Sequence, residues 1–237
     1  MNSNNYGINE RTPDQEGLYT HDLYGDTLFH KSSFRKAWLD EYVLYPTVIF
    51  DIGCYDGGDS LRFLTWYPNA KIYCFEAMKE NYDLTVKKIG HTNININHSA
   101  VFNVDGELEF MKVARVQPDG ELGDFMGGYY SYEPTHLRNH NVIPLPNEKV
   151  KAVTIKTFCK QNNIDHIDFA HIDVEGAGCE VIEGMGDILP TVVFIEHQAP
   201  GAFGGKNPGE GDLINAFTIR GYFLEKNLAN DYLFVKS

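Results

Sequence analysis

The sequence is poor in basic residues and has no long hydrophobic run. Its 237 residues include 20 lysines and arginines against 33 aspartates and glutamates, which gives a formal charge of −13. Because no run of Lys and Arg offsets this charge, nucleic acids and anionic membrane surfaces are not expected partners. No stretch of eighteen apolar residues is present, so we expect no membrane span. The polar N-terminal segment carries no signal-peptide pattern, which makes a cytoplasmic protein the expectation.

Cysteine is also scarce, and the four cysteines are far apart in the sequence. None belongs to a C-x-x-C motif, so the spacing predicts neither a zinc site nor a redox pair. Cys54 and Cys74 lie in or beside apolar strand patterns, where we expect buried, reduced thiols. The chain is long enough for one large α/β domain with a full hydrophobic core.

The segment from residue 47 to residue 66 lacks a phosphate-binding loop but contains a glycine-rich turn. The run Thr-Val-Ile-Phe predicts a buried parallel strand over 47–52, and a helix is expected over about 58–66. Gly53 and Gly57 allow a sharp turn between the two. Tyr55 stands where the G-x-G-x-x-G fingerprint needs its second glycine, and no Lys follows for a Walker loop. NAD, FAD and nucleoside triphosphates are therefore not favoured.

An acidic residue, Asp51, directly precedes these glycines. It would repel an anion and attract a cationic amino-acid ligand. S-adenosylmethionine carries both a sulfonium and an ammonium group, so the turn suits this cofactor. Asp59 or Ser60 is expected to cap the helix that follows. The alternative is a plain strand-to-helix turn without a ligand.

Strands and helices alternate along the chain. The expected strands cover residues 47–52, 70–75, 94–101, 107–113, 150–155, 167–174, 192–196, 222–224 and 233–235. The expected helices cover residues 30–45, 58–66, 80–89, a segment starting at 157, a segment ending at 188, and 213–219. This alternation predicts an α/β fold with a doubly wound, mostly parallel sheet.

Polar residues stand where several of these strands end. Functional residues of such a sheet gather at the carboxyl ends of its strands. Glu76 lies about twenty residues after the glycines and is placed to accept hydrogen bonds from two ribose hydroxyls, or alternatively to cap the next helix. Ser99 and Ala100 end the third strand, where adenine contacts are expected. Asp173 and Glu196 end the two later strands.

Four segments together carry a family resemblance. They are Asp51-Ile-Gly-Cys-Tyr-Asp-Gly57, Phe75-Glu-Ala77, Ser99-Ala-Val101 and Ile167-Asp-Phe-Ala-His-Ile-Asp-Val-Glu-Gly176. Over about residues 47–198 the sequence resembles the FkbM-type methyltransferases, which are class I, S-adenosylmethionine-dependent enzymes. The resemblance implies a Rossmann-like sheet with a reversed terminal strand, and O-methylation, often of a sugar or polyketide hydroxyl.

The resemblance also implies roles for individual residues. Cofactor contacts fall on the turn and on the ends of the second and third strands, at Asp51, Gly53, Tyr55, Gly57, Glu76, Ser99 and Ala100. Asp173 and Glu175 are expected beside the reacting centre, with Glu175 near the acceptor. A Tyr-rich stretch replaces the serine-rich segment expected there, and Tyr129 and Tyr130 are candidates for stacking on a sugar or another flat acceptor.

Four residues are candidates for the base that removes the acceptor proton. They are His197, His171, Asp173 and Glu196, and we favour His197 because it titrates near neutrality and follows a strand end. The alternative for His197 is a capping or solvent-facing residue. His171 stands where relatives commonly carry Lys, and its alternative is a hydrogen-bonded core residue. A divalent metal could bind Asp173, Glu196 and His197, but with no dense Asp-Asp pair it is not favoured.

The expected organisation is a single methyltransferase domain over residues 46–237, preceded by an arm and a helix in residues 1–45. Residues 115–147 are rich in glycine, proline and aromatic residues, and we expect them to form a lid or wall over the acceptor cavity. Two other functions stay open: a non-catalytic binding module with the same fold, and a nicotinamide oxidoreductase. The sequence does not predict the acceptor or the oligomeric state.

Overall fold

The computed structural model describes residues 32–131, 134, 137, 142–198, 201 and 206–237. A seven-stranded sheet forms the centre of the molecule, with strand order β10-β11-β9-β8-β1-β2-β3. Its strands are β1 (Val48–Ile52), β2 (Lys71–Glu76), β3 (Asn95–His98), β8 (Phe169–Ile172), β9 (Val192–Glu196), β10 (Tyr222–Leu228) and β11 (Asp231–Lys236). All neighbours from β9 to β3 are parallel, and β11 is antiparallel to both β9 and β10. The predicted Rossmann-like sheet with a reversed terminal strand is confirmed.

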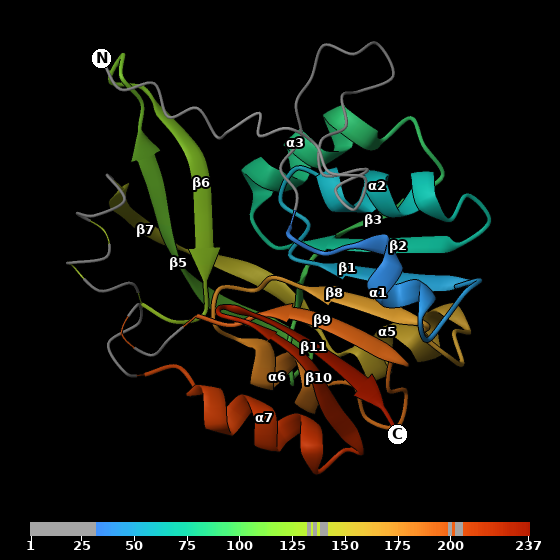
Figure 1. The fold of residues 1–237 in the computed structure, drawn as a ribbon. Helices are drawn as coiled ribbons and strands as arrows, with labels where there is room; N and C mark the ends of the chain where they lie inside the picture. The colour runs from blue at the N-terminus through green and yellow to red at the C-terminus, as the bar shows by residue number, and fades with distance from the viewer. Residues whose placement is uncertain (1–31, 132–133, 135–136, 138–141, 199–200, 202–205) are drawn as a thin grey trace, which may run out of the picture.

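Helices cover both faces of this sheet (Figure 1). They are α1 (Lys36–Asp40), α2 (Gly58–Trp66), α3 (Lys79–Ile89), α5 (Ile155–Asn162), α6 (Gly178–Glu183) and α7 (Glu210–Thr218). Every residue of β1 is buried, as expected for a central parallel strand covered on two sides. Alternate side chains of β1 enter different cores: Ile49 packs with Phe63 of α2, and Phe50 packs with Phe158 of α5.

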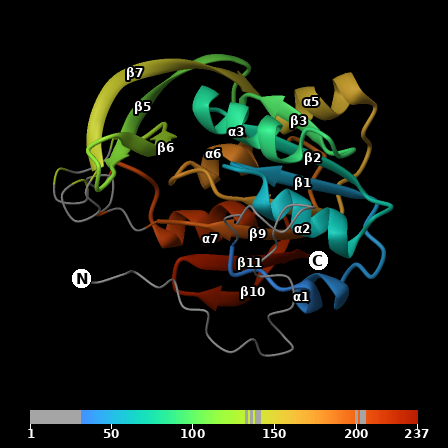
Figure 2. The ribbon, with the colours of Figure 1, turned by 90° about the horizontal axis from the view of Figure 1, so that it is seen from above.

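A second, four-stranded sheet stands beside the carboxyl ends of the parallel strands (Figures 1 and 2). Its order is β4-β7-β5-β6, with β4 (Ala100–Val101), β5 (Gly106–Val116), β6 (Leu122–Gly128) and β7 (Val142–Val153). Long antiparallel ladders join β5 to β6 and β7. The sequence predicted strands over 107–113 and 150–155, within β5 and at the end of β7, but it predicted neither β6 nor a separate second sheet.

Three predicted elements differ from the structure. The helix expected over 30–45 is limited to the five residues of α1. The strand expected over 94–101 is divided between the two sheets, as β3 and β4. The irregular lid expected over 115–147 contains, where it is described, β6 and the ends of β5 and β7. Glycine and proline suggested a loop, but the ladder hydrogen bonds of β5 hold the neighbouring strands extended. The arm in residues 1–31 lies outside the described residues.

Among the residues that the structure describes, no helix is long and apolar enough to cross a membrane.

Candidate active site

A cavity of about 460 Å³ lies between the carboxyl ends of the parallel strands and the second sheet. Its walls come from the β1–α2 turn, the ends of β2, β8 and β9, the start of β11, the segment before α1, and the β5–β6 hairpin. Most predicted site residues line it: Asp51, Gly53, Tyr55, Glu76, Ser99, Ala100, His171, Asp173, Glu175 and Glu196. The strand-end reasoning therefore located the cavity.

The glycine turn packs tightly against two neighbouring strands. Gly53 has φ +83°, and a Cβ atom there would lie 1.7 Å from the carbonyl oxygen of Asp173. The backbone N–H groups of Gly53 and Cys54 both donate to the Phe75 carbonyl, at 2.9 and 3.0 Å. Any side chain at position 53 would displace the end of β8, because an L-residue is strained at this φ and has no room.

Gly57 has a different role from the one predicted. It has φ +80° and is the N-cap residue of α2, and a Cβ atom there would lie 2.6 Å from Cδ1 of Ile89 in α3. It does not line the cavity formed by the described residues. The expected caps, Asp59 and Ser60, lie inside α2 instead. Gly57 therefore serves helix packing rather than ligand contact.

Glu76 joins the end of β2 to the glycine turn. Its Oε2 accepts the N–H of Tyr55 at 2.9 Å, and its Oε1 accepts the N–H of Met78 at 2.8 Å. Burial raises the pKa of Glu76 to about 7, although the N–H groups of Met78 and Tyr55 oppose the shift. Helix α3 has Met78 as its N-cap residue, so Glu76 is not the cap that we considered as its alternative. Its carboxyl group faces the cavity and retains lone pairs for further donors.

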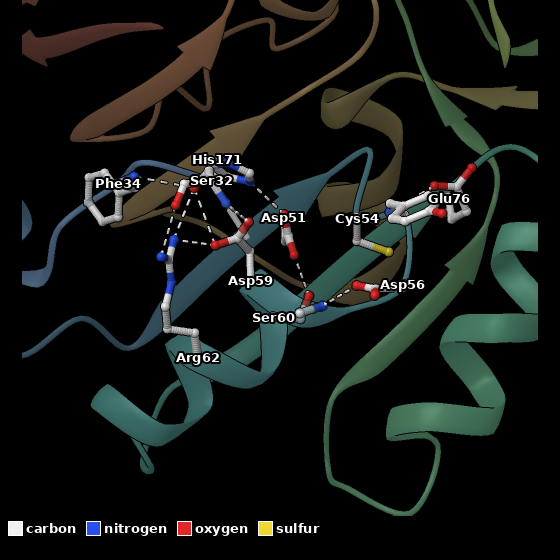
Figure 3. Close-up of polar contacts among 12 residues, drawn as sticks. Ser32, Phe34, Asp51, Cys54, Asp56, Asp59, Ser60, Arg62, Glu76 and His171 are labelled. Atoms are coloured by element: carbon white, nitrogen blue, oxygen red, sulfur yellow. Dashed lines mark hydrogen bonds and ion pairs between the residues drawn. The ribbon is translucent and has the colours of Figure 1, made fainter. Parts of the chain in front are cut away.

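Asp51 and His171 form a buried pair within the cavity wall (Figure 3). Nδ1 of His171 lies 2.7 Å from Oδ1 of Asp51, and Oγ of Ser60 donates to Oδ2 of Asp51 at 2.5 Å. The imidazole also stacks on Phe194, with ring centroids 6.0 Å apart. Burial alone lowers the pKa of His171, but the charge of Asp59 and the bond to Asp51 outweigh it and raise the pKa. His171 thus has the contacts of a hydrogen-bonded core residue that orients Asp51, the alternative named for it.

Asp173 and Glu196 bring two carboxyl groups together. Ile172 pairs with Ile195 in the parallel β8–β9 ladder, so the next residue of each strand, Asp173 and Glu196, reaches the same edge of the sheet. Burial, the charges of Glu196 and Glu175, and a hydrogen bond with Glu196 raise the pKa of Asp173 well above its usual range. The closeness of the two carboxyl groups adds to burial in disfavouring the charged form of Asp173. Among the described residues no group of three or more His, Cys, Asp or Glu side chains is arranged to hold a metal ion.

Glu175 lies two positions after Asp173, at the same end of the cavity. It lines the cavity and accepts a hydrogen bond from Nε2 of Gln198 at 2.8 Å. Its backbone has φ 51°, which turns the chain between β8 and α6.

His197 lies outside the cavity walls formed by the described residues. Its Nε2 donates to the Pro208 carbonyl at 3.0 Å, and the side chain is almost fully buried. Burial lowers the pKa of His197, although the Pro208 carbonyl opposes the shift. The residue follows the last position of β9, and side chains alternate between the faces of a strand, so it points away from Glu196. The structure does not support His197 as the base.

Tyr129 and Tyr130 are also not brought to the cavity. The ring of Tyr129 packs on Phe102, with centroids 4.8 Å apart, and the Tyr130 hydroxyl donates to Glu180 of α6. Within this stretch Phe125 of β6 lines the cavity instead, and its carbonyl accepts from Nδ2 of Asn81 at 2.9 Å. The described part of 115–147 is thus a wall of the cavity.

Several polar residues of the cavity were not predicted as site residues, among them Ser32, Ser33, Asp59 and Asp231. Asp59 was considered only as a helix cap. The two serines come from the segment before α1 and Asp231 from the start of β11, and no local sequence pattern relates them to the strand ends.

The whole chain can be compared with known proteins. The curated 2-O-methyltransferase NoeI of Sinorhizobium fredii is 26% identical over 183 residues, which cover 74% of each chain. Among solved structures, Streptomyces venezuelae DesVI is 9% identical and covers 85% of this chain and 88% of its own, with a TM-score of 0.49. The sugar N-methyltransferase KedS8 from Streptoalloteichus is 11% identical over 84% of each chain, with a TM-score of 0.45.

A family of proteins also matches most of the chain. The sequence pattern of the methyltransferase FkbM domain matches residues 51–224, which contain both the glycine turn and the Asp173–Glu196 pair. The chain belongs to the FkbM methyltransferase family.

Proposed function

We propose that this methyltransferase transfers the methyl group of S-adenosylmethionine to a hydroxyl of a sugar, a glycan or a related polyhydroxylated small molecule. The observation that carries the proposal is a single cavity that holds Glu76 and the glycine turn together with the carboxyl pair of Asp173 and Glu196. Glu76 and the glycine turn suit the methyl donor, and the carboxyl pair suits a hydroxyl acceptor.

The donor end fits S-adenosylmethionine by the chemistry of its side chains. The Glu76 carboxyl can accept hydrogen bonds from two ribose hydroxyls. Gly53 leaves the backbone accessible at the turn, and acidic side chains favour a ligand with a sulfonium and an ammonium group. When bound, S-adenosylmethionine supplies an electron-deficient methyl carbon, and the family match supports its use here.

The acceptor end can take up the proton that O-methylation releases. An acceptor hydroxyl must lose one proton as its oxygen bonds to carbon, so a base within hydrogen-bonding reach is needed. Asp173 and Glu196 both line the cavity, where a carboxylate oxygen can accept this proton from the hydroxyl. Positioning of the two reactants supplies the remaining rate enhancement.

Two facts support a hydroxyl acceptor. The curated relative is named as a 2-O-methyltransferase, and the cavity presents carboxylates, which accept hydrogen bonds from hydroxyl groups. The formal charge of −13 supports a small acceptor over a nucleic acid.

Ligand binding tests the proposal first. S-adenosylhomocysteine should raise the melting temperature of the protein and NAD should not, because only a ligand that binds the folded state stabilises it. Glu76→Ala should weaken S-adenosylhomocysteine by about tenfold or more, since a hydrogen bond to a charged group contributes roughly 1.5–3 kcal/mol. Glu107→Ala, at a side chain that is 71% exposed on β5, is the matched control.

Transfer of a radiolabelled methyl group to a panel of glycosides tests the second step. Product should carry the label as an O-methyl ether. Stabilisation by NAD alone, or a label found only on nitrogen, would contradict the proposal.

A further inference from the structure

Three neighbouring strands place a row of carboxylates along one side of the cavity. Asp173 follows β8, Glu196 ends β9, and Asp231 begins β11, where it lies opposite Glu196 in the antiparallel ladder. All three line the cavity. Asp231 therefore extends the pair of Asp173 and Glu196 to a row of three acidic residues that leads away from the glycine turn.

The segment before α1 lies against this row. Oγ of Ser33 donates to Oδ2 of Asp231 at 2.6 Å, across 198 positions of sequence. The N–H of Ser32 donates to Oδ2 of Asp59 at 2.7 Å. Both serines line the cavity, so this segment forms a wall opposite the second sheet.

A buried arginine holds this wall in place (Figure 3). Nη1 and Nη2 of Arg62 donate to the backbone carbonyl and to Oγ of Ser32, at 3.1 and 2.9 Å, and the guanidinium also pairs with Asp59. On the other side of Ser33, the ring of Phe34 is buried and stacks on Phe169 with centroids 4.5 Å apart. Ser33 is therefore fixed on both sides and presents its hydroxyl at the cavity.

We propose that Ser33 and Asp231 recognise the acceptor and make the enzyme selective for saccharides without a negative charge near the methylated hydroxyl. The inference rests on the proposed function. A serine hydroxyl and a carboxylate can bind the vicinal hydroxyls of a neutral sugar or the ammonium group of an amino sugar. An acceptor carboxylate or phosphate would face Asp173, Glu196 and Asp231 and be repelled. Among the described lining residues, the permanently charged cation is Arg115, which belongs to β5 in the opposite wall.

The test measures saccharide binding to the full chain saturated with S-adenosylhomocysteine. The probes are methyl glycosides of three classes: neutral hexoses and deoxyhexoses, 2-amino sugars, and uronic acids. We expect neutral or amino glycosides to bind at least about tenfold more tightly than uronides. Asp231→Asn and Ser33→Ala should each weaken that binding by about fivefold to tenfold and leave the affinity for S-adenosylhomocysteine unchanged. Asp165→Asn, at a side chain that is 94% exposed, is the matched control.

The outcomes that contradict this inference differ from the one that contradicts the proposed function. Uronides that bind as tightly as neutral glycosides, Asp231→Asn and Ser33→Ala proteins with unchanged saccharide affinity, or no saccharide binding at all would overturn this inference. Failure of S-adenosylhomocysteine itself to bind would instead overturn the proposed function.

Discussion

Removal of the Arg62 side chain tests how the cavity wall that contains Ser32 and Ser33 is held in place. Arg62 is fully buried, and its charge is balanced by Asp59, which is 8% exposed. In Arg62→Met the apolar volume is roughly kept, but Asp59 stays buried without its cation and Ser32 loses two donors. Removal of one partner of a buried ion pair costs about 3–5 kcal/mol of the free energy of unfolding. For a chain of this size the melting temperature should fall by roughly 6–20 °C.

The matched control is an exposed pair of similar spacing. Lys79 and Asp83 pair along α3 with side chains 55% and 58% exposed, so Lys79→Met should cost less than about 1 kcal/mol. A double variant, Arg62→Met with Asp59→Leu, should recover part of the loss because no uncompensated buried charge remains.

Urea denaturation and hydrogen exchange provide the readouts. Exchange at residues 32–40 should accelerate in Arg62→Met and stay unchanged in Lys79→Met, because Arg62 is the one of these two residues that donates to Ser32. If Arg62→Met loses no more stability than Lys79→Met, the buried pair does not hold this segment and the reasoning fails.

Three further predictions concern the cavity residues. Asp173→Asn should lower the methyl-transfer rate by about a hundredfold or more with little change in cofactor affinity, since it removes a proton acceptor and keeps the shape; near-wild-type turnover would remove Asp173 from the reacting centre. Because the pKa of Glu76 is raised to about 7, its contribution to stability is present at low pH and is lost as pH rises toward 7, by about 3 kcal/mol relative to Glu76→Gln. Urea titrations of both proteins at pH 5 and pH 7.5 measure this difference, and parallel pH profiles would refute it. His197→Ala should keep methyl-transfer activity within about threefold per folded molecule, and a hundredfold loss would restore His197 as the base.

Local patterns in the sequence were sufficient to predict the central sheet and the donor end of the cavity. The first strand, its glycine turn and Glu76 lie within about thirty residues of sequence. They also contact one another in the fold, where Glu76 accepts a hydrogen bond from the Tyr55 N–H. The pair of Asp173 and Glu196 was found for a similar reason, because both end parallel strands of one sheet.

The contact between Ser33 and Asp231 could not be predicted in this way. Ser33 and Asp231 meet only because the antiparallel β11 returns its first residue to the edge where β9 ends. Parts of β5 and β7 were predicted as strands, but β6 and the first half of β7 were missed because they contain glycine or proline, and pairing with β5 keeps them extended. His197 follows the end of β9 as predicted, but neighbouring side chains of a strand face opposite sides, so it points away from Glu196 and the cavity.

The contact between Gly53 and the Asp173 carbonyl has a consequence for altering the enzyme. The turn that suits the methyl donor rests directly on the backbone of the residue that suits the acceptor, with no room for a single methyl group between them. Gly53→Ala should therefore impair acceptor alignment as well as donor binding. Conversely, we expect changes of acceptor preference to be more accessible through Ser33 and Asp231 than through replacements that shift β8. Through the contact at Gly53 the proposed donor site is coupled to the proposed reacting centre, whereas the proposed acceptor contacts at Ser33 and Asp231 come from other segments of the chain.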